Sequence, residues 1–268
     1  MTQSTAQLTS EPDAVQEFFV PEGSIVRKIW ADGDTILLIF AGAAAEFALS
    51  KAVDWLYFTG RLPSDPLGRL LSTVTYAKRI VFSQKQDAFK AIDSISAIHH
   101  GVEYKRGFQI PEWAYRDVLF MLIDYSIRAY EVLHRQLTNE EKEEVFRVFN
   151  QLGEKMEMTG LPETYQVWMN MRQKHLKRNL EFSDYTSDLF LQYKLHLGSF
   201  RYHMLLQVQA VLAPKKVRSL MGLKKKRPIL LLIGFYRIIR PLGLNSFLKR
   251  LVLPGQYRQQ FMQLGGTA

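Results

Sequence analysis

The chain has 268 residues, of which 47% are hydrophobic, and we expect it to form one domain with a full core. It contains no cysteine, which excludes disulfides, thiolate ligation of haem, iron–sulfur clusters and cysteine zinc sites. The formal net charge is +9 at pH 7. A region in which positive charge is concentrated favours a polyanionic surface as a partner.

Residues 1–19 are polar and acidic, without the basic start and apolar centre of a secretory signal. We therefore expect a protein that is not secreted and that lies in the cytoplasm, either free or attached to the periphery of a membrane. Three regions are expected: a polar tail over 1–22, a helical domain over 23–213, and a basic, apolar helical segment over 214–268 that packs on the domain or on a membrane.

Apolar residues recur with the period of an α-helix along nearly the whole chain, and no useful length of strand alternation interrupts them. The sequence therefore predicts an all-α protein, a single-domain bundle of many helices. In chain order, the expected helices are Ser24–Ala31, Thr35–Leu49 after a cap at Asp34, a helix from Asp65-Pro66 to Phe82, Ala88–Val102, Pro111–His134, Thr138 to about Met158, Pro162 to about Arg178, Ser183–Ala213 and an apolar helix near 228–236.

The second of these helices contains a run of small residues at 41–45. Small residues allow either another helix or a flat cofactor to approach the backbone closely. Packing against another helix is the commoner explanation, and we expect it here.

The helix that starts at Asp65-Pro66 carries a cation and a hydroxyl one turn apart. Arg69 and Thr73 lie on one flank of its apolar stripe. A guanidinium pairs with a carboxylate in a fork, so Arg69 could hold an acidic group of a ligand. A salt bridge for Arg69 and a simple packing role for Thr73 remain the alternatives.

The segment Ala88–Val102 contains two adjacent histidines that helical geometry separates. At about 100° per residue, Ile92, Ile95 and His99 lie on one apolar stripe, whereas His100 points away from it. We therefore expect His99 to face inward. Two interpretations remain open from the residues alone: a core histidine with a satisfied ring, or an axial ligand of haem iron in an apolar pocket.

Residues Pro111–His134 are apolar around most of the helix, so we expect this helix to be central and buried. Asp124 and Arg128 on its narrow polar stripe are four residues apart and are expected to pair with each other. Orientation of a cofactor ligand or a substrate is the alternative. Glu131 and His134 form one E-x-x-H motif, whereas a di-iron carboxylate site needs two such motifs and further carboxylates.

Three other histidines are not expected to form a site. His196 and His203 are seven residues apart on one helix, which is a poor spacing for joint ligation of one ion. We interpret them as packing or surface residues. His175 stands among three basic neighbours, and we expect it on a solvated face.

Positive charge is concentrated at the C-terminal end of the chain. Residues 189–268 carry 14 Lys and Arg and no Asp or Glu. The polybasic run 224–227 is followed by an apolar stretch that is too short to span a membrane. This combination is typical of attachment to an anionic membrane surface, although a helix packed on the core has the same pattern. We expect no nucleic-acid partner, because no helix-turn-helix, zinc spacing or aromatic platform is present.

The residues around Arg69 and His99 also match the pattern of a known family. The pattern reads D-P-x-x-R-x-x-x-T, then Val-Phe, then I-H-x-x-V, and here it is carried by Asp65, Pro66, Arg69, Thr73, Val81, Phe82, Ile98, His99 and Val102. Shorter matches lie at 23–28, 137–141, 160–162 and 213–223. The chain therefore resembles the rubber oxygenase (latex clearing protein) and MpaB oxygenase family over most of its length.

The resemblance implies a helical bundle of globin-like architecture that holds haem b in a buried pocket. It implies that His99 is the proximal ligand of the haem iron, and that Arg69 and Thr73 lie beside the haem and support its binding. It further implies an oxidoreductase that uses dioxygen to cleave a C=C bond of an isoprenoid chain, giving aldehyde and ketone ends. The catalytic residues stay unknown.

The chain departs from the family in ways that bear on its substrate. Rubber oxygenases can place a lysine on the far side of the haem, at the position of Ser72, whose hydroxyl cannot act as an amine ligand. A tryptophan common in the family's middle helix has no clear equivalent here. Rubber oxygenases are secreted, whereas residues 1–19 here do not have the pattern of a secretory signal. We therefore expect a smaller apolar isoprenoid or lipid-like substrate, with dioxygen as the second substrate. The alternatives are a non-enzymatic lipid-binding protein at the membrane periphery and a di-iron carboxylate oxidase.

Overall fold

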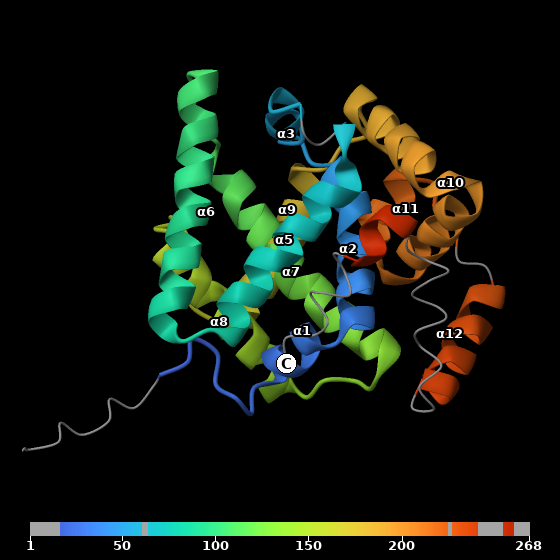
Figure 1. The fold of residues 1–268 in the computed structure, drawn as a ribbon, viewed down its shortest axis with the longest axis horizontal. Coiled ribbons are helices and arrows are strands. Elements are labelled where there is room, and N and C mark those ends of the chain that lie inside the picture. The colour runs from blue at the N-terminus through green and yellow to red at the C-terminus, as the bar shows by residue number, and fades with distance from the viewer. Residues whose placement is uncertain (1–16, 61–63, 225–226, 241–253, 260–268) are drawn as a thin grey trace, which may run out of the picture.

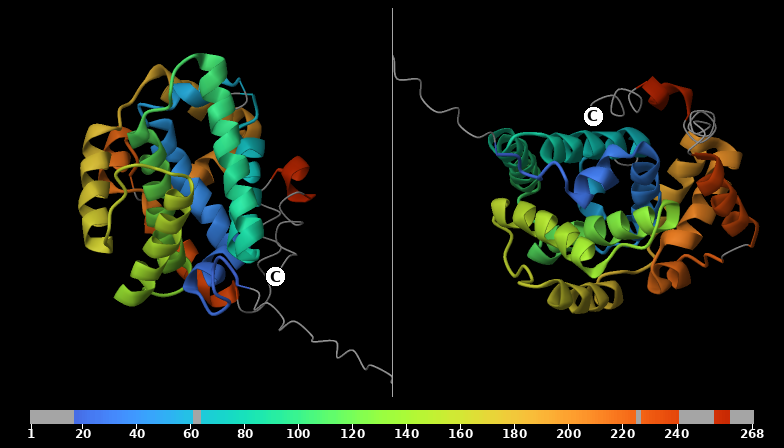
Figure 2. Two further views of the ribbon diagram at one scale, coloured as in Figure 1. Left: turned by 90° about the vertical axis from the view of Figure 1, so that its left-hand side faces the viewer. Right: turned by 90° about the horizontal axis from the view of Figure 1, so that it is seen from below.

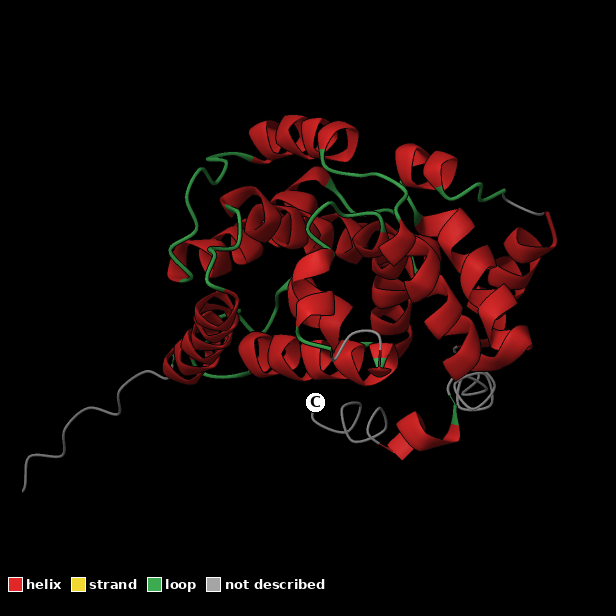
Figure 3. Cartoon of the chain, turned by 90° about the horizontal axis from the view of Figure 1, so that it is seen from above, coloured by secondary structure: helices red, strands yellow, loops and turns green. Residues whose placement is uncertain are grey.

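The structure is a computed structural model that describes residues 17–60, 64–224, 227–240 and 254–259. Within these ranges it contains helices and loops but no β-strand, so the predicted all-α, single-domain, multi-helix fold is confirmed (Figure 1, Figure 3). The helices are α1 (Ile25–Ala31), α2 (Gly33–Ala48), α3 (Asp54–Phe58), α5 (Pro66–Phe82), α6 (Lys85–Arg106), α7 (Glu112–Leu133), α8 (Asn139–Lys155), α9 (Tyr165–Arg178), α10 (Asp184–Leu212), α11 (Lys215–Leu220) and α12 (Arg227–Ile239).

Helices α2 and α7 pack along each other at the centre of the bundle, and the other helices surround them (Figure 2). The two backbones approach closely because Gly42 of α2 faces the ring of Tyr125 on α7. A Cβ atom added at Gly42 would lie 2.5 Å from a ring carbon of Tyr125. Gly42, within the run of small residues at 41–45, therefore serves helix packing, and the predicted central position of the helix beginning near Pro111 is confirmed.

Helices α5 and α6 are joined by a short turn at Ser83 and Gln84 and diverge from it, with their chain directions roughly opposed (Figure 1). The Asp65 side chain caps α5 by accepting a hydrogen bond from the Gly68 N–H at 2.9 Å, as the Asp-Pro start predicts. Arg69 lies about as many residues before this turn as His99 lies after it. The two residues are therefore at about the same distance from the turn along their helices.

Two helices differ in detail from the prediction. The cap of α2 is Asp32 and not Asp34, because the Asp32 carboxylate accepts hydrogen bonds from the N–H groups of Asp34 and Thr35. Helix α10 bends at Gly198, whose φ of 73° lies in the left-handed region that interrupts a helix. The long aromatic-rich helix expected over Ser183–Ala213 therefore consists of two helical pieces.

The C-terminal helix α12 packs against α7 and α10. The Tyr236 hydroxyl donates a hydrogen bond to Asp34 at 2.6 Å, and the Arg240 guanidinium lies 2.7 Å from the Asp32 carboxylate. The opposite face of α12 exposes three apolar side chains, those of Leu231, Phe235 and Ile238.

Parts of the expected terminal segments lie outside the described residues, namely 1–16, 225–226, 241–253 and 260–268. In the part of the chain that the structure describes, no helix has the length and apolar character needed to cross a membrane.

Candidate functional site

His99 lies partly buried on α6, whereas the adjacent His100 is exposed, as the helical spacing predicts. The His99 ring packs edge-on against Tyr115 of α7, with ring centroids 5.2 Å apart. Its Nδ1 atom is buried and has no hydrogen-bond partner among the described residues. Desolvation of the ring, together with the nearby positive charge of Arg69, lowers the pKa of His99 to about 4, so the imidazole is neutral at pH 7.

Arg69 is held against its own helix by two hydroxyl groups. Its Nη1 atom donates hydrogen bonds to Thr73 Oγ1 at 3.0 Å and to Ser72 Oγ at 3.3 Å. Both hydroxyls in turn donate to the backbone carbonyl oxygen of Arg69. Arg69 and Thr73 therefore lie together on α5, and the charge of Arg69 is near enough to His99 on α6 to contribute to its lowered pKa.

Two residues that sequence reasoning missed complete the surroundings of His99. Glu103, one turn further along α6, accepts hydrogen bonds from the Tyr115 hydroxyl at 3.1 Å and from the Ile110 N–H at 2.8 Å. Burial, together with the hydrogen bond to Glu103, raises the pKa of the Tyr115 phenol. The i,i+4 spacing of His99 and Glu103 is visible in the sequence, whereas the contact with Tyr115 depends on tertiary packing.

The arrangement around His99 has the chemistry of a ligand for haem iron. A neutral imidazole with an unpartnered buried nitrogen can donate an electron pair to a metal, and haem requires only one such protein ligand. Arg69 adds a guanidinium nearby, which matches the carboxylate of a haem propionate. Among the described residues, no group of three or more His, Cys, Asp or Glu side chains could hold a metal ion. The candidate ligand at this place is therefore the single imidazole of His99, with the guanidinium of Arg69 nearby.

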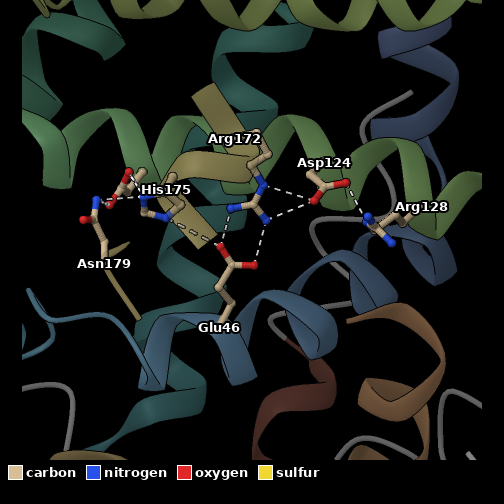
Figure 4. A network of polar contacts seen from close by, with 7 residues as sticks. Glu46, Asp124, Arg128, Arg172, His175 and Asn179 are labelled. Carbon is tan, nitrogen blue, oxygen red and sulfur yellow. Dashed lines mark hydrogen bonds and ion pairs between the residues drawn. The ribbon is translucent and has the colours of Figure 1, made fainter. Parts of the chain in front are cut away.

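A second polar cluster lies in the core where α2, α7 and α9 meet (Figure 4). Arg172 of α9 donates hydrogen bonds to both carboxylate oxygens of Glu46 on α2 and to Asp124 on α7. Asp124 also pairs with Arg128 at 2.5 Å, so the expected i,i+4 pair is confirmed. Because the carboxylates are bonded to guanidinium groups, the cluster joins three helices through their buried charges.

The prediction that His175 lies on a solvated face is wrong. His175 is only 7% exposed, and its Nδ1 atom contacts the Asp117 carboxylate and, at 3.0 Å, the amide of Asn179 (Figure 4). The basic residues next to it in sequence lie on other faces of α9. The buried face of this helix instead contains His175 with Arg172 and Trp168, three and seven residues earlier.

The remaining histidines make separate contacts. The Nδ1 atoms of His196 and His203 each lie within 2.9 Å of the backbone carbonyl four residues earlier, so each ring contacts its own turn of α10. His134 lies 3.0 Å from Asp32, whereas Glu131 pairs with a lysine of α8. The two members of the E-x-x-H motif therefore bind different partners.

A comparison with protein families matches residues 27–241 to the family described as ER-bound oxygenase mpaB/B'/Rubber oxygenase, catalytic domain. The matched range includes Arg69, Thr73 and His99 and covers well over half of the chain, which confirms the resemblance seen in the sequence. In a comparison with curated proteins, none matches the chain.

Proposed function

The chain belongs to the family of mpaB and rubber oxygenase catalytic domains, and from this premise we propose that it is a haem b-dependent oxygenase. The proposed substrate is an apolar isoprenoid or another lipid-like molecule, and the proposed reaction is oxidative cleavage of a C=C bond with dioxygen. Oxygenase activity is stated by the family description. Haem, the substrate class and the bond cleaved are inferences from the resemblance and from the residues around His99.

The observation that carries this proposal is that the His99 ring is partly buried, lies near Arg69 and has a lowered pKa. The Nδ1 atom of the ring is buried and has no hydrogen-bond partner among the described residues, so the imidazole is not committed to another side chain, and this supports the proposal. The pKa of about 4 keeps the imidazole unprotonated at neutral pH, which is the form that binds a metal.

Haem b would supply the iron at which dioxygen is activated. The protein's own groups would hold it: His99 would bind the iron, and Arg69, whose guanidinium donates a hydrogen bond to Thr73, would pair with a propionate. No general acid or base is assigned, because Glu46 and Asp124 are both ion-paired in the core cluster.

An absorbance spectrum of the full-length protein, expressed with added haem, tests the proposal. The wild-type protein should show a Soret band, His99→Ala should lose it, and His100→Ala should keep it, with all three proteins folded by circular dichroism. His100 is the matched control because it is adjacent in sequence but exposed. A wild-type protein without a Soret band, or a His99→Ala protein with wild-type haem content, would contradict the proposal.

One observation also favours a second function, binding to an anionic membrane surface through residues 214–268. Leu231, Phe235 and Ile238 form an exposed apolar stripe on α12, with exposed fractions of 76%, 60% and 73%. In the sequence, the polybasic run 224–227 ends at Arg227, the first residue of this helix. An exposed apolar stripe next to several cations is the combination that holds a peripheral helix at a charged lipid surface.

Flotation with lipid vesicles tests this attachment. The full-length protein should float with vesicles containing phosphatidylserine and not with purely zwitterionic vesicles. The double substitution Leu231→Ser with Ile238→Ser should abolish flotation. The matched control is Leu195→Ser, which removes an equally exposed leucine from α10. Equal flotation of the double variant and the wild type would show that α12 is not the attachment.

A further inference from the structure

An apolar cavity of about 300 Å³ lies beside α5, away from Arg69 and Thr73. Its walls come from α2, α5, α10 and α12, and the α5 part of the lining includes Leu67 and Leu71. At 100° per residue these leucines lie on a different face of α5 from Arg69 and Thr73, which share a flank with each other. None of Arg69, Thr73 and His99 lines the cavity.

The lining of the cavity is hydrocarbon almost throughout, with side chains such as Ile36, Phe40, Val74, Leu205 and Ile233. Protein interiors contain few voids larger than a water molecule, and an apolar cavity of about 150 Å³ stays dry and binds small apolar molecules. The cavity here is about twice that size and reaches the lower end of the range for ligand pockets, about 300–1,000 Å³. Its chemistry favours a long apolar chain.

Helix α12 forms one wall of this cavity, which is partly open. It contributes Ile229, Ile233 and Ile239 to the lining, and polar contacts attach its C-terminal end to the rest of the protein. The Tyr236 hydroxyl binds Asp34, while Arg240 binds Asp32 and lies 2.9 Å from His134 Nε2. Water can replace such polar contacts when the helix moves, so this attachment permits this wall to move.

We propose that the cavity binds the hydrocarbon chain of a single-chain lipid and that α12 closes over the bound chain. The cavity requires a ligand with a long, unbroken apolar chain. Either a linear fatty acid or a branched isoprenoid alcohol has such a chain. This is a ligand site in addition to the one around His99. It does not depend on haem, so the two proposals can fail separately.

The experiment uses the full-length protein after removal of copurified lipid, with cis-parinaric acid as a fluorescent linear chain. The wild type should bind one chain per protein. Ala41→Phe, which places a ring in the cavity, should weaken binding at least tenfold, and Ala97→Phe, on the exposed surface of α6, should leave it unchanged. His99→Ala should bind the chain as the wild type does, because His99 does not line the cavity.

Competition with farnesol and with lauric acid distinguishes the two sources of the chain. Displacement of the probe by either competitor supports the proposal and assigns the preferred chain.

If Ala41→Phe does not fold, Val208→Phe fills the same cavity from α10. Tyr236→Phe should speed dissociation several-fold, because it removes the hydrogen bond to Asp34.

Three results would overturn the proposal. They are absence of binding to the wild type, wild-type affinity in a folded cavity-filling variant, and loss of binding in His99→Ala. An unchanged dissociation rate in Tyr236→Phe would overturn the role of α12 as the cover.

Discussion

Arg172 of α9 binds both carboxylate oxygens of Glu46 on α2, in a part of the core where each side chain is only 2% exposed. The same guanidinium also donates to Asp124 on α7, at 3.0 and 3.1 Å. One cation therefore compensates two buried carboxylates that come from different helices. Burial of charges is costly unless they are paired, so the stability of this part of the core depends on all three groups together.

Replacing Arg172 with leucine should lower the free energy of unfolding by about 3–5 kcal/mol, because it leaves the buried Glu46 carboxylate without its guanidinium partner. Arg147→Leu is the control, since Arg147 is exposed on α8, and it should change stability by no more than about 0.5 kcal/mol. Urea unfolding followed by circular dichroism measures both. Similar losses in the two variants would show that the buried pairing is not a main source of stability.

Gly42→Ala should destabilise the protein by about 1–3 kcal/mol, because the added methyl group overlaps the Tyr125 ring between the two central helices. Gly101→Ala, on an open part of α6, should instead raise stability by about 0.5–1 kcal/mol through helix propensity. The melting temperature should therefore fall in Gly42→Ala and rise in Gly101→Ala, as measured by thermal unfolding. A shift of the same sign in both would contradict the close approach of α2 and α7.

The acid sensitivity of the protein should depend on Glu141. Hydrogen bonds from Arg135 lower the pKa of Glu141 from 4.5 to about 2, while Glu141 also closes the capping box of α8 with Thr138. Because the folded state holds the proton less tightly than the unfolded state, this contribution to stability is present above pH 4.5 and is lost as the pH falls through about 2.

Glu141→Gln should therefore show a smaller fall in melting temperature than the wild type between pH 5 and pH 2. Glutamine can still close the capping box, so the change isolates the charge. Glu143→Gln, an exposed position on the same helix, is the matched control. A wild-type pH profile in Glu141→Gln would refute the prediction.

If the site around His99 holds haem, Arg69→Gln should release haem several-fold faster than the wild type, because it removes the cation that pairs with a propionate. Thr73→Val should have a smaller effect of the same sign, since it removes the hydroxyl that orients Arg69. Transfer of haem to apomyoglobin measures the rate. Arg79→Gln, exposed further along α5, is the control and should match the wild type.

Local sequence patterns predicted much of the fold because they depend on neighbouring residues. The Asp65-Pro66 start of α5 and the Thr138–Glu141 capping box of α8 appear where expected, since each needs only residues within one turn. The inward orientation of His99 follows in the same way from the 3.6-residue period. Its proposed role as a haem ligand comes instead from the family pattern.

The sequence by itself determined most of the longer helices, their apolar faces and the family pattern that the chain carries, because these are properties of neighbouring residues. Only the tertiary structure decided which polar groups meet in the core. Arg172 lies 126 residues from Glu46 and 48 from Asp124, and Tyr236 lies 202 residues from Asp34. No local pattern contains such pairs. They form because helix docking buries these groups together, and each buried charge or polar group then requires a partner from whichever helix lies opposite.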